Sequence, residues 1–174
     1  MDTLEQFALG DADAFEALFR QYQSDVYRWI VRFVRNPGVA EELTVETFWR
    51  IHRHQKRFDA RRPFGPWARR IATRVALDYL KSVGCQELAG EGRETVQPST
   101  SNPALQAAMR GQIARAFSAL PVRLRVAASL ALIEECPYQE IAHALDISLS
   151  AVKMRVARAA TLLRASLERM DIRP

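Results

Sequence analysis

The stretch PYQEIAHALDISLSAVKMRVARAATLLRASL, residues 137–167, decides the fold of the second half of the chain. The proline and the apolar spacing after it predict a short helix over residues 138–145. A tight connection at residues 146–147 follows, and Ser148 can cap a longer helix by accepting a backbone hydrogen bond. Two helices joined by such a turn form a helix-turn-helix, in which the second helix enters the major groove of DNA.

The longer helix separates into two faces when its residues are placed 100° apart. The apolar face consists of Val152, Val156, Ala159 and Leu163. Small residues occupy the opposite face, so the helix can approach the bases while flanking cations meet phosphates. An ordinary amphipathic helix with a basic outer face would show the same distribution of residues. The preceding helix and turn favour DNA binding. The predicted DNA contacts are Ser148, Ser150, Ala151, Lys153, Met154, Arg155 and Arg158. Arg158 is the best candidate for a bidentate contact with a base.

Helical periodicity continues through the rest of the chain, and no β-alternation extends beyond a few residues. A first long helix, with Asp13 and Glu16 as its expected capping pair, ends at the NPG sequence of residues 36–38. A second runs from about Val39 to about His54, and a third has Pro66 in its first turn and reaches Ser82.

Residues 84–103 are rich in Gly, Pro, Ser, Thr and Glu and lack periodicity, which indicates a flexible linker. The chain is therefore predicted to be all-α, with two small helical domains at residues 1–83 and 104–174. The second domain contains the helix-turn-helix. An extended linker of this length spans at most roughly 65–70 Å, which exceeds one turn of DNA.

The net charge of +5 hides two basic blocks separated by acidic segments. Residues 56–83 carry 8 basic and 2 acidic side chains, and residues 104–174 carry 10 and 6. Residues 1–55 and 84–103 are acidic on balance. Two basic blocks indicate two separate contacts with a polyanion, although two solvated helix faces would give the same pattern.

The first basic block contains RFDARRPFGPWARRIA, residues 57–72, in which arginines alternate with aromatic residues. Aromatic rings near a basic groove can stack on unpaired bases, which is how proteins hold single strands. Two alternatives remain: Phe58, Phe64 and Trp67 form a core that anchors the loop, or the segment lies on a membrane surface, which the alanine-rich apolar side disfavours. The predicted single-strand site consists of Arg61, Arg62, Phe64, Trp67, Arg70, Arg74 and Lys81.

Other classes of protein are disfavoured by what the sequence lacks. Cys85 and Cys136 lie far apart without a CxxC motif, so neither a disulfide framework nor a zinc site is expected. The acidic start has no apolar signal core, and no apolar run is long enough for a membrane span. His52 and His54 would point roughly 200° apart on a helix and cannot chelate one ion. Because the sequence lacks a phosphate-binding glycine loop and any GxSxG or HExxH motif, we expect no enzyme activity, cofactor, metal or small-molecule substrate. The cysteine usage and the absence of a signal sequence lead us to expect a cytoplasmic protein.

Five segments occur in a fixed order: AFEALFRQYQSDVYRW, AEELTVETFWRIHRH, RPFGPWARRIATRVALDYLK, ALPVRLRVAASLALIEECPYQEIAHAL and AVKMRVARAATLLR. In this order, and with a linker between the third and the fourth, they resemble the bacterial RNA polymerase sigma factors of the small extracytoplasmic-function (ECF) class. The resemblance covers almost the whole chain. It implies a transcription initiation factor that binds core RNA polymerase and directs it to specific promoters.

The resemblance also implies a role for each part. Residues 1–83 resemble sigma region 2, which docks on the clamp helices of the largest polymerase subunit and melts the minus-ten promoter element. Residues 104–174 resemble sigma region 4, which reads the minus-thirty-five element. A further implied partner is an anti-sigma factor. The resemblance implies that the docking residues are Glu42, Leu43, Glu46, Phe48 and Trp49. Some of these are expected to belong to the core rather than the interface, Phe48 above all.

This sequence departs from the family pattern at several positions. Val45 stands where Gln is frequent, and Arg74 stands where Asn is frequent, which favours a phosphate contact over base reading there. Asp146 takes the place of the turn glycine, and Asp tolerates the left-handed conformation moderately well. Ala151 and Met154 replace the usual Thr and Ser, so a different duplex sequence is expected.

Two other functions remain compatible with the residues alone. A conventional helix-turn-helix regulator would bind duplex DNA without polymerase and use residues 1–83 for dimerisation or sensing. Those residues show no ligand-pocket signature, which counts against it. A helical adaptor with no nucleic-acid role would show absent or salt-insensitive DNA binding.

Overall fold

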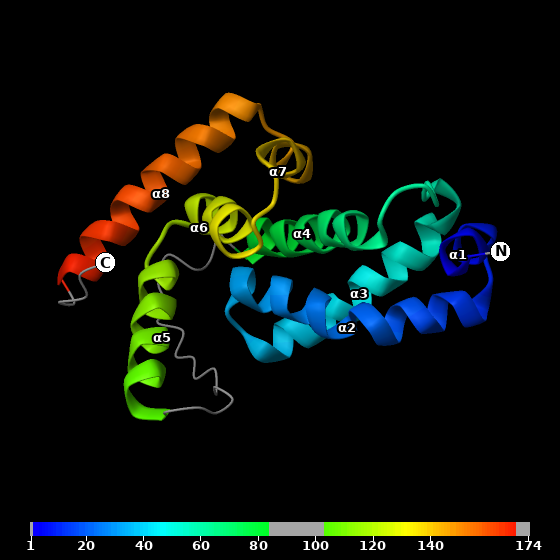
Figure 1. The fold of residues 1–174 in the computed structure, drawn as a ribbon, viewed down its shortest axis with the longest axis horizontal. Helices are drawn as coiled ribbons and strands as arrows, with labels where there is room; N and C mark the ends of the chain where they lie inside the picture. The colour runs from blue at the N-terminus through cyan, green and yellow to red at the C-terminus, as the bar shows by residue number, and fades with distance from the viewer. Residues whose placement is uncertain (1, 84–102, 170–174) are drawn as a thin grey trace. The chain divides into compact units, whose positions relative to one another are not determined.

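The computed structural model describes residues 2–83 and 103–169, with side chains described from residue 107 onward in the second part. Every regular element in these residues is helical, and the chain divides into two compact units, one on each side of the gap. Figure 1 shows α1 to α4 in the first unit and α5 to α8 in the second. The predicted all-α fold of two small helical domains is confirmed.

The first unit is a bundle of three long helices with a short helix at its start. Its elements are α1 (Thr3–Leu9), α2 (Ala12–Val34), α3 (Pro37–His54), the 3-10 turn η1 (Gln55–Arg57) and α4 (Phe64–Val83). Helices α2, α3 and α4 pack against one another, and α1 lies against α2 and η1. Apolar residues at three- and four-residue spacing form the facing sides. The buried ones include Leu18, Val26, Ile30, Phe33, Phe48, Ile51, Ala68, Ala72 and Val75.

Polar side chains fix where α2 and α3 begin. Asp11 accepts a hydrogen bond of 2.8 Å from a backbone N–H in the first turn of α2, and Asn36 accepts one of 3.2 Å in α3. Both are therefore N-caps. The predicted capping role of Asp13 with Glu16 is wrong, because Asp11 takes it and Asp13 lies inside the first turn. Because Asn36 caps α3, that helix begins at Pro37 rather than near Val39.

Helix α1 is absent from the sequence prediction. It spans seven residues and buries one side chain, Phe7, so it has no apolar period to detect. Its start is fixed by Glu5, whose carboxylate accepts a hydrogen bond of 3.0 Å from the backbone N–H of Asp2. Gly10 ends it at φ 95°, in the left-handed region that favours glycine.

The second unit is built around its last helix. It consists of α5 (Pro103–Ser118), α6 (Val122–Ala128), the π turn η2 (Ser129–Ile133), α7 (Tyr138–Leu145) and α8 (Leu149–Arg169). Helix α8 packs against α5, α6 and α7. One core cluster joins α5, α6 and α8 through Ala116, Leu120, Ala128, Ala159 and Leu163.

The π turn η2 follows α6 directly and changes the helical register at its end. A π turn adds a residue to the helical turn and so rotates the residues after it. Leu130 remains buried, whereas Leu132 and Ile133 are 48% and 42% exposed. The backbone N–H of the buried Cys136 then returns to the carbonyl of Leu130 at 2.9 Å, which closes the connection before α7.

Candidate nucleic-acid and polymerase interfaces

The turn between α7 and α8 has the geometry of a helix-turn-helix. Asp146 adopts φ 54° and ψ 50°, the left-handed conformation expected at the position of the turn glycine. The N–H of Ile147 reaches the carbonyl of Ala142 at 3.1 Å. The hydroxyl of Ser148 accepts a hydrogen bond of 3.1 Å from the N–H of Ala151, so the predicted cap of α8 is confirmed.

This turn gives a first testable prediction. Asp146→Val is expected to lower the free energy of unfolding by about 1–2 kcal/mol, because a β-branched side chain is strained in the left-handed region. Asp146→Gly removes the side chain and is expected to cost nothing. Urea unfolding followed by circular dichroism measures both, with Gln139→Val on the exposed side of α7 as the control. Equal stability of the Val and Gly variants would contradict the prediction.

Helix α8 buries one face and leaves the other exposed, as its wheel predicts. Val152, Val156, Ala159 and Leu163 are all buried. Of the predicted DNA contacts, two are partly buried, Ala151 and Arg155. The exposed ones are Ser148, Ser150, Lys153, Met154 and Arg158. The arrangement leaves a basic helix face with room to enter a groove, since the packing side is already used.

The predicted single-strand site brings together a loop and one face of α4. Arg61 and Arg62 are exposed in the loop between η1 and α4. Asp59 shapes this loop: its carboxylate accepts the N–H of Arg61 at 3.1 Å, and its carbonyl accepts the N–H of Arg62 at 2.9 Å. Arg70, Arg74 and Lys81 are exposed on α4 and lie within about 40° of one another on the helix. We call these last three side chains the basic stripe.

The aromatic residues beside the loop form a packed cluster. Phe64 is 2% exposed, and its ring centre lies 5.5 Å from that of Phe7 and 4.9 Å from that of Tyr22. Phe58 is also buried, 4.9 Å from Trp67, which is partly exposed. The interpretation of Phe58 and Phe64 as anchors of the loop therefore fits the structure better than direct stacking on a base. A base contact by Phe64 remains a prediction and requires the ring to leave this cluster.

Phe7 is the residue of this site that sequence reasoning missed. Its side chain is fully buried among rings from α2, the loop and α4. The Asp2–Glu5 capping pattern is the signal that points to α1 in the sequence. Nothing in the sequence indicates that Phe7 reaches rings more than 50 positions further along the chain.

The predicted docking residues divide between the core and the surface of α3. Phe48 is 3% exposed and packs on Phe19 at 4.7 Å, so it belongs to the core. Trp49 is 52% exposed, with the guanidinium of Arg53 lying 4.6 Å from its ring centre. Glu42 is exposed, and Leu43 and Glu46 are partly exposed. Glu42, Glu46 and Trp49 lie on the face of α3 opposite the core.

A hollow lies between α2 and α3 beside this face. It has a volume of about 400 Å³ and includes Val45, which is 69% exposed. The lining residues are Phe19, Gln23, Ser24, Tyr27, Arg28, Glu41, Thr44 and Val45. The departure from the family pattern at Val45 thus places an apolar side chain on open surface.

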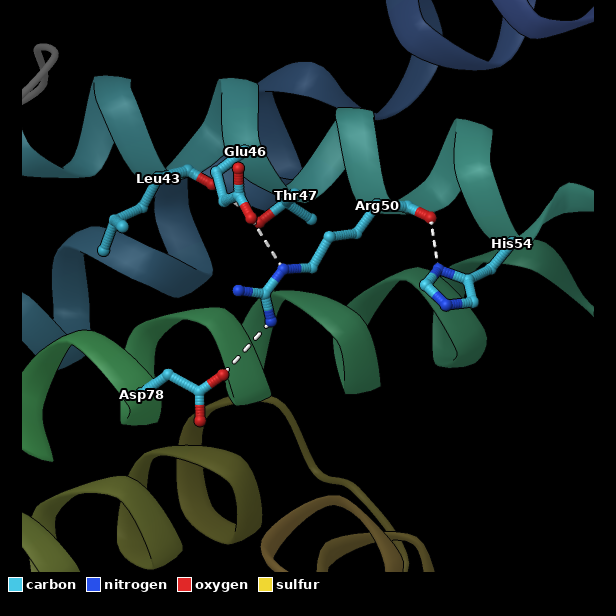
Figure 2. Close-up of polar contacts among 6 residues, drawn as sticks. All are labelled: Leu43, Glu46, Thr47, Arg50, His54 and Asp78. Carbon is cyan, nitrogen blue, oxygen red and sulfur yellow. Dashed lines mark hydrogen bonds and ion pairs between the residues drawn. The ribbon is translucent and has the colours of Figure 1, made fainter.

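An ion-pair network that the sequence did not predict connects α3 with α4. Arg50 Nε donates to Glu46 Oε1 at 2.7 Å, and Arg50 Nη1 donates to Asp78 Oδ2 at 3.1 Å. Figure 2 shows the guanidinium between the two carboxylates. The hydrogen bond to Glu46 raises the pKa of Arg50, burial lowers it, and the bond to Asp78 raises it further, so its pKa lies above the usual range.

The described residues contain no cluster of three or more His, Cys, Asp or Glu side chains suited to a metal ion. His52 stacks edge-on against Phe15 at 5.2 Å, while His54 Nδ1 lies 2.8 Å from the carbonyl of Arg50. Within the same parts of the chain, no helix combines the length and apolar character that crossing a membrane requires.

Two family models match the chain: Sigma-70 region 2 at residues 18–84 and Sigma-70, region 4 at residues 110–163. The RNA polymerase sigma factor CarQ of Myxococcus xanthus is 29% identical over 170 residues, which cover 97% of this chain and 98% of CarQ. The ECF RNA polymerase sigma factor SigM of Bacillus subtilis is 27% identical over 155 residues, 86% of this chain and 93% of SigM.

The fold also resembles that of the sigma factor RpoE from Bartonella quintana, solved in complex with the anti-sigma factor NepR. The TM-score is 0.70 at 17% identity, covering 88% of this chain and 96% of that chain.

These matches define a class of transcription initiation factors, which are not enzymes. The chain belongs to the ECF subfamily of the sigma-70 family of bacterial RNA polymerase sigma factors. It binds core RNA polymerase and directs it to specific promoters, where it melts the minus-ten element and reads the minus-thirty-five element. The sigma-factor function is therefore the one supported, rather than the alternative of a conventional helix-turn-helix regulator.

Proposed function

We propose that the two units divide promoter recognition between them. Residues 1–83 dock on the clamp helices of the largest polymerase subunit and capture the melted minus-ten strand. Residues 104–174 read the minus-thirty-five duplex, and residues 84–103 link the two. One observation carries this proposal: each unit has an exposed basic helix face on the side opposite a buried apolar stripe.

Within the first unit, the strand follows the loop arginines and then the basic stripe. Arg61 and Arg62 meet phosphates at the loop, and Arg70, Arg74 and Lys81 continue the path along α4. Trp67 is the aromatic residue with exposed surface at the start of this path, so it is the proposed base contact. Phe64 acts by holding the loop in place.

Within the second unit, α8 enters the major groove by its exposed face. Arg158 makes the base contact, since its guanidinium lies on the small-residue face and has a donor pair suited to guanine. Lys153 and Arg155 meet the phosphates on either side, and Ser150, Ala151 and Met154 face the bases. Ser148 caps the helix and orients its first turn towards the phosphate backbone.

The protein itself performs no catalysis and acts in the cytoplasm, where the polymerase is. An anti-sigma factor holds it inactive until a signal arrives. The similarity in fold to RpoE, which was solved with the anti-sigma factor NepR, supports this partner. A protein that copurifies with the chain and suppresses its transcription in a reconstituted assay would establish it.

Reconstituted transcription tests the division of roles. Core polymerase with the wild-type protein is expected to give run-off transcripts from promoters found by start-site mapping. Mutating the minus-thirty-five sequence should lower transcription with the wild type but have little further effect on Arg158→Ala. Absence of any transcript and of co-elution with core polymerase would refute the proposed function.

The exposed Trp49 gives a prediction for the docking face. Trp49→Ala is expected to weaken binding to core polymerase about 10- to 30-fold, because exposed aromatic side chains at the centre of interfaces contribute most of the affinity. Leu9→Ala, which removes another exposed apolar side chain from the same unit, is the control. Fluorescence anisotropy of labelled protein titrated with core polymerase measures both. An affinity as high as that of the control would place the interface elsewhere.

A further inference from the structure

Arg50 lies where the docking helix α3 meets the promoter-binding helix α4. One donor of its guanidinium holds Glu46, one turn earlier on α3, and another holds Asp78, 28 positions further on, in α4. Figure 2 shows both bonds on the same side chain. Arginine is suited to this place because its planar group has donors that point in different directions, whereas lysine offers a single point charge.

Each carboxylate in the network belongs to a surface with a proposed role. Glu46 is one of the docking residues on α3. Asp78 follows Arg74 by four positions and precedes Lys81 by three, so it lies beside the basic stripe. The Arg50 side chain therefore connects the surface that meets polymerase with the surface that meets the DNA strand.

The hydrophobic core already holds the inner sides of the two helices, through residues such as Ile51 on α3 and Val75 on α4. The ion pairs lie on the solvent side, where the Arg50 side chain is 34% exposed. There they limit how far the outer edges of α3 and α4 can slide past each other. They also hold the Glu46 carboxylate in one orientation on the docking face.

We propose that Arg50 is a positioning residue that fixes the basic stripe relative to the docking face, so that polymerase binding on α3 places α4 correctly for promoter opening. The inference rests on the proposed function of these two surfaces. It predicts that breaking the bond to Asp78 impairs opening without impairing binding to core polymerase.

A purely electrostatic effect of Asp78 and a positioning effect predict opposite changes in the contact with DNA, so one variant can distinguish them. Asp78→Asn removes a negative charge beside the basic stripe, so electrostatics alone would strengthen the contact with DNA. Loss of positioning would weaken it. Asp25→Asn is a matched control, because Asp25 pairs with Arg28 on the same helix and connects no two helices.

The experiment uses core polymerase, the full-length protein and one promoter labelled with 2-aminopurine in the minus-ten element. Asp78→Asn is expected to keep its affinity for core within about twofold and to slow opening about fivefold, the upper end for a partly exposed ion pair. Arg50→Gln is expected to slow opening by a similar factor and also to weaken core binding, because Glu46 loses its partner. The double variant should open no more slowly than Arg50→Gln alone, since both changes break the same bond.

The outcomes are distinguishable. Opening by Asp78→Asn as fast as by Asp25→Asn, or faster, would overturn the inference while the wild-type protein still opens the promoter. Additive slowing in the double variant would also overturn it. Failure of the wild-type protein to bind core or to open the promoter would overturn the proposed function, and this inference with it.

Discussion

The Phe64→Ala variant is expected to lose about 3–5 kcal/mol of its free energy of unfolding, because truncating a buried phenylalanine removes its apolar burial and leaves a cavity. Phe64 is 2% exposed, and its ring contacts Phe7, Tyr22, Phe58 and Trp67. Such a loss is a large part of the stability of a small domain. Urea unfolding followed by tryptophan fluorescence measures it.

A second variant separates anchoring from base stacking. Phe64→Leu keeps most of the apolar volume and should cost less than about 1.5 kcal/mol. If Phe64 anchors the loop, this variant still binds a single-stranded minus-ten probe together with core polymerase at near wild-type affinity. A stacked base is worth roughly 1–3 kcal/mol, so a stacking ring replaced by Leu would lose much of the binding.

The matched comparison is Trp67→Leu, in which the replaced ring is partly exposed beside the same loop. Its affinity for the single-stranded probe is expected to fall about tenfold, as the removal of one stacked ring predicts. Strong loss of binding in a stably folded Phe64→Leu together with no loss in Trp67→Leu would reverse the two roles.

The long helices could be predicted because each one buries a continuous apolar face. Val152, Val156, Ala159 and Leu163 illustrate this: the wheel assigned them to one side, and the structure buries all four. A local hydrogen bond could also be predicted from the sequence, since Ser148 caps the helix that follows it. Such signals depend only on residues close together in the sequence.

Features that depend on distant residues could not be predicted in the same way. Phe7 is buried by rings from α2 and α4, and its own helix is too short to show a period. The bond between Arg50 and Asp78 requires knowledge of how α3 and α4 pack. The π turn η2 changes the helical register without a distinct composition, so the exposure of Leu132 and Ile133 was not foreseen.

The same limit explains why the sequence does not decide whether a given aromatic residue belongs to the core or to an interface. A helix wheel gives the direction of a side chain but not what covers it. Phe48 and Trp49 are adjacent in sequence, yet one is 3% exposed and the other 52%. The difference arises because Phe15 and Phe19 of α2 cover Phe48, while the outer side of α3 faces solvent.

Neutralising the basic stripe is expected to have the largest effect on promoter opening. The triple variant Arg70→Gln, Arg74→Gln, Lys81→Gln should weaken capture of the minus-ten strand about 100-fold, at roughly 1 kcal/mol or more for each cation–phosphate interaction that is removed. All three side chains are exposed on α4, so the fold should be retained. Affinity for core polymerase should stay near the wild-type value, because the three cations lie on α4, whereas the proposed docking residues lie on α3.

The salt dependence of binding distinguishes direct contact from a general effect of charge. Each cation that meets a phosphate of a single strand contributes about 0.7 to the slope of log K against log salt, so removing three should lower the slope by about 2. The control is a variant with three other exposed cations neutralised, Arg20→Gln, Lys56→Gln, Arg115→Gln, which has the same net charge. An equal change of slope in the control would indicate that only net charge matters. An unchanged slope in the stripe variant would mean that the basic stripe does not contact the strand, because a cation that displaces no counterion from the strand cannot be bound to it. The loop arginines would then be the contacts of this unit with phosphate.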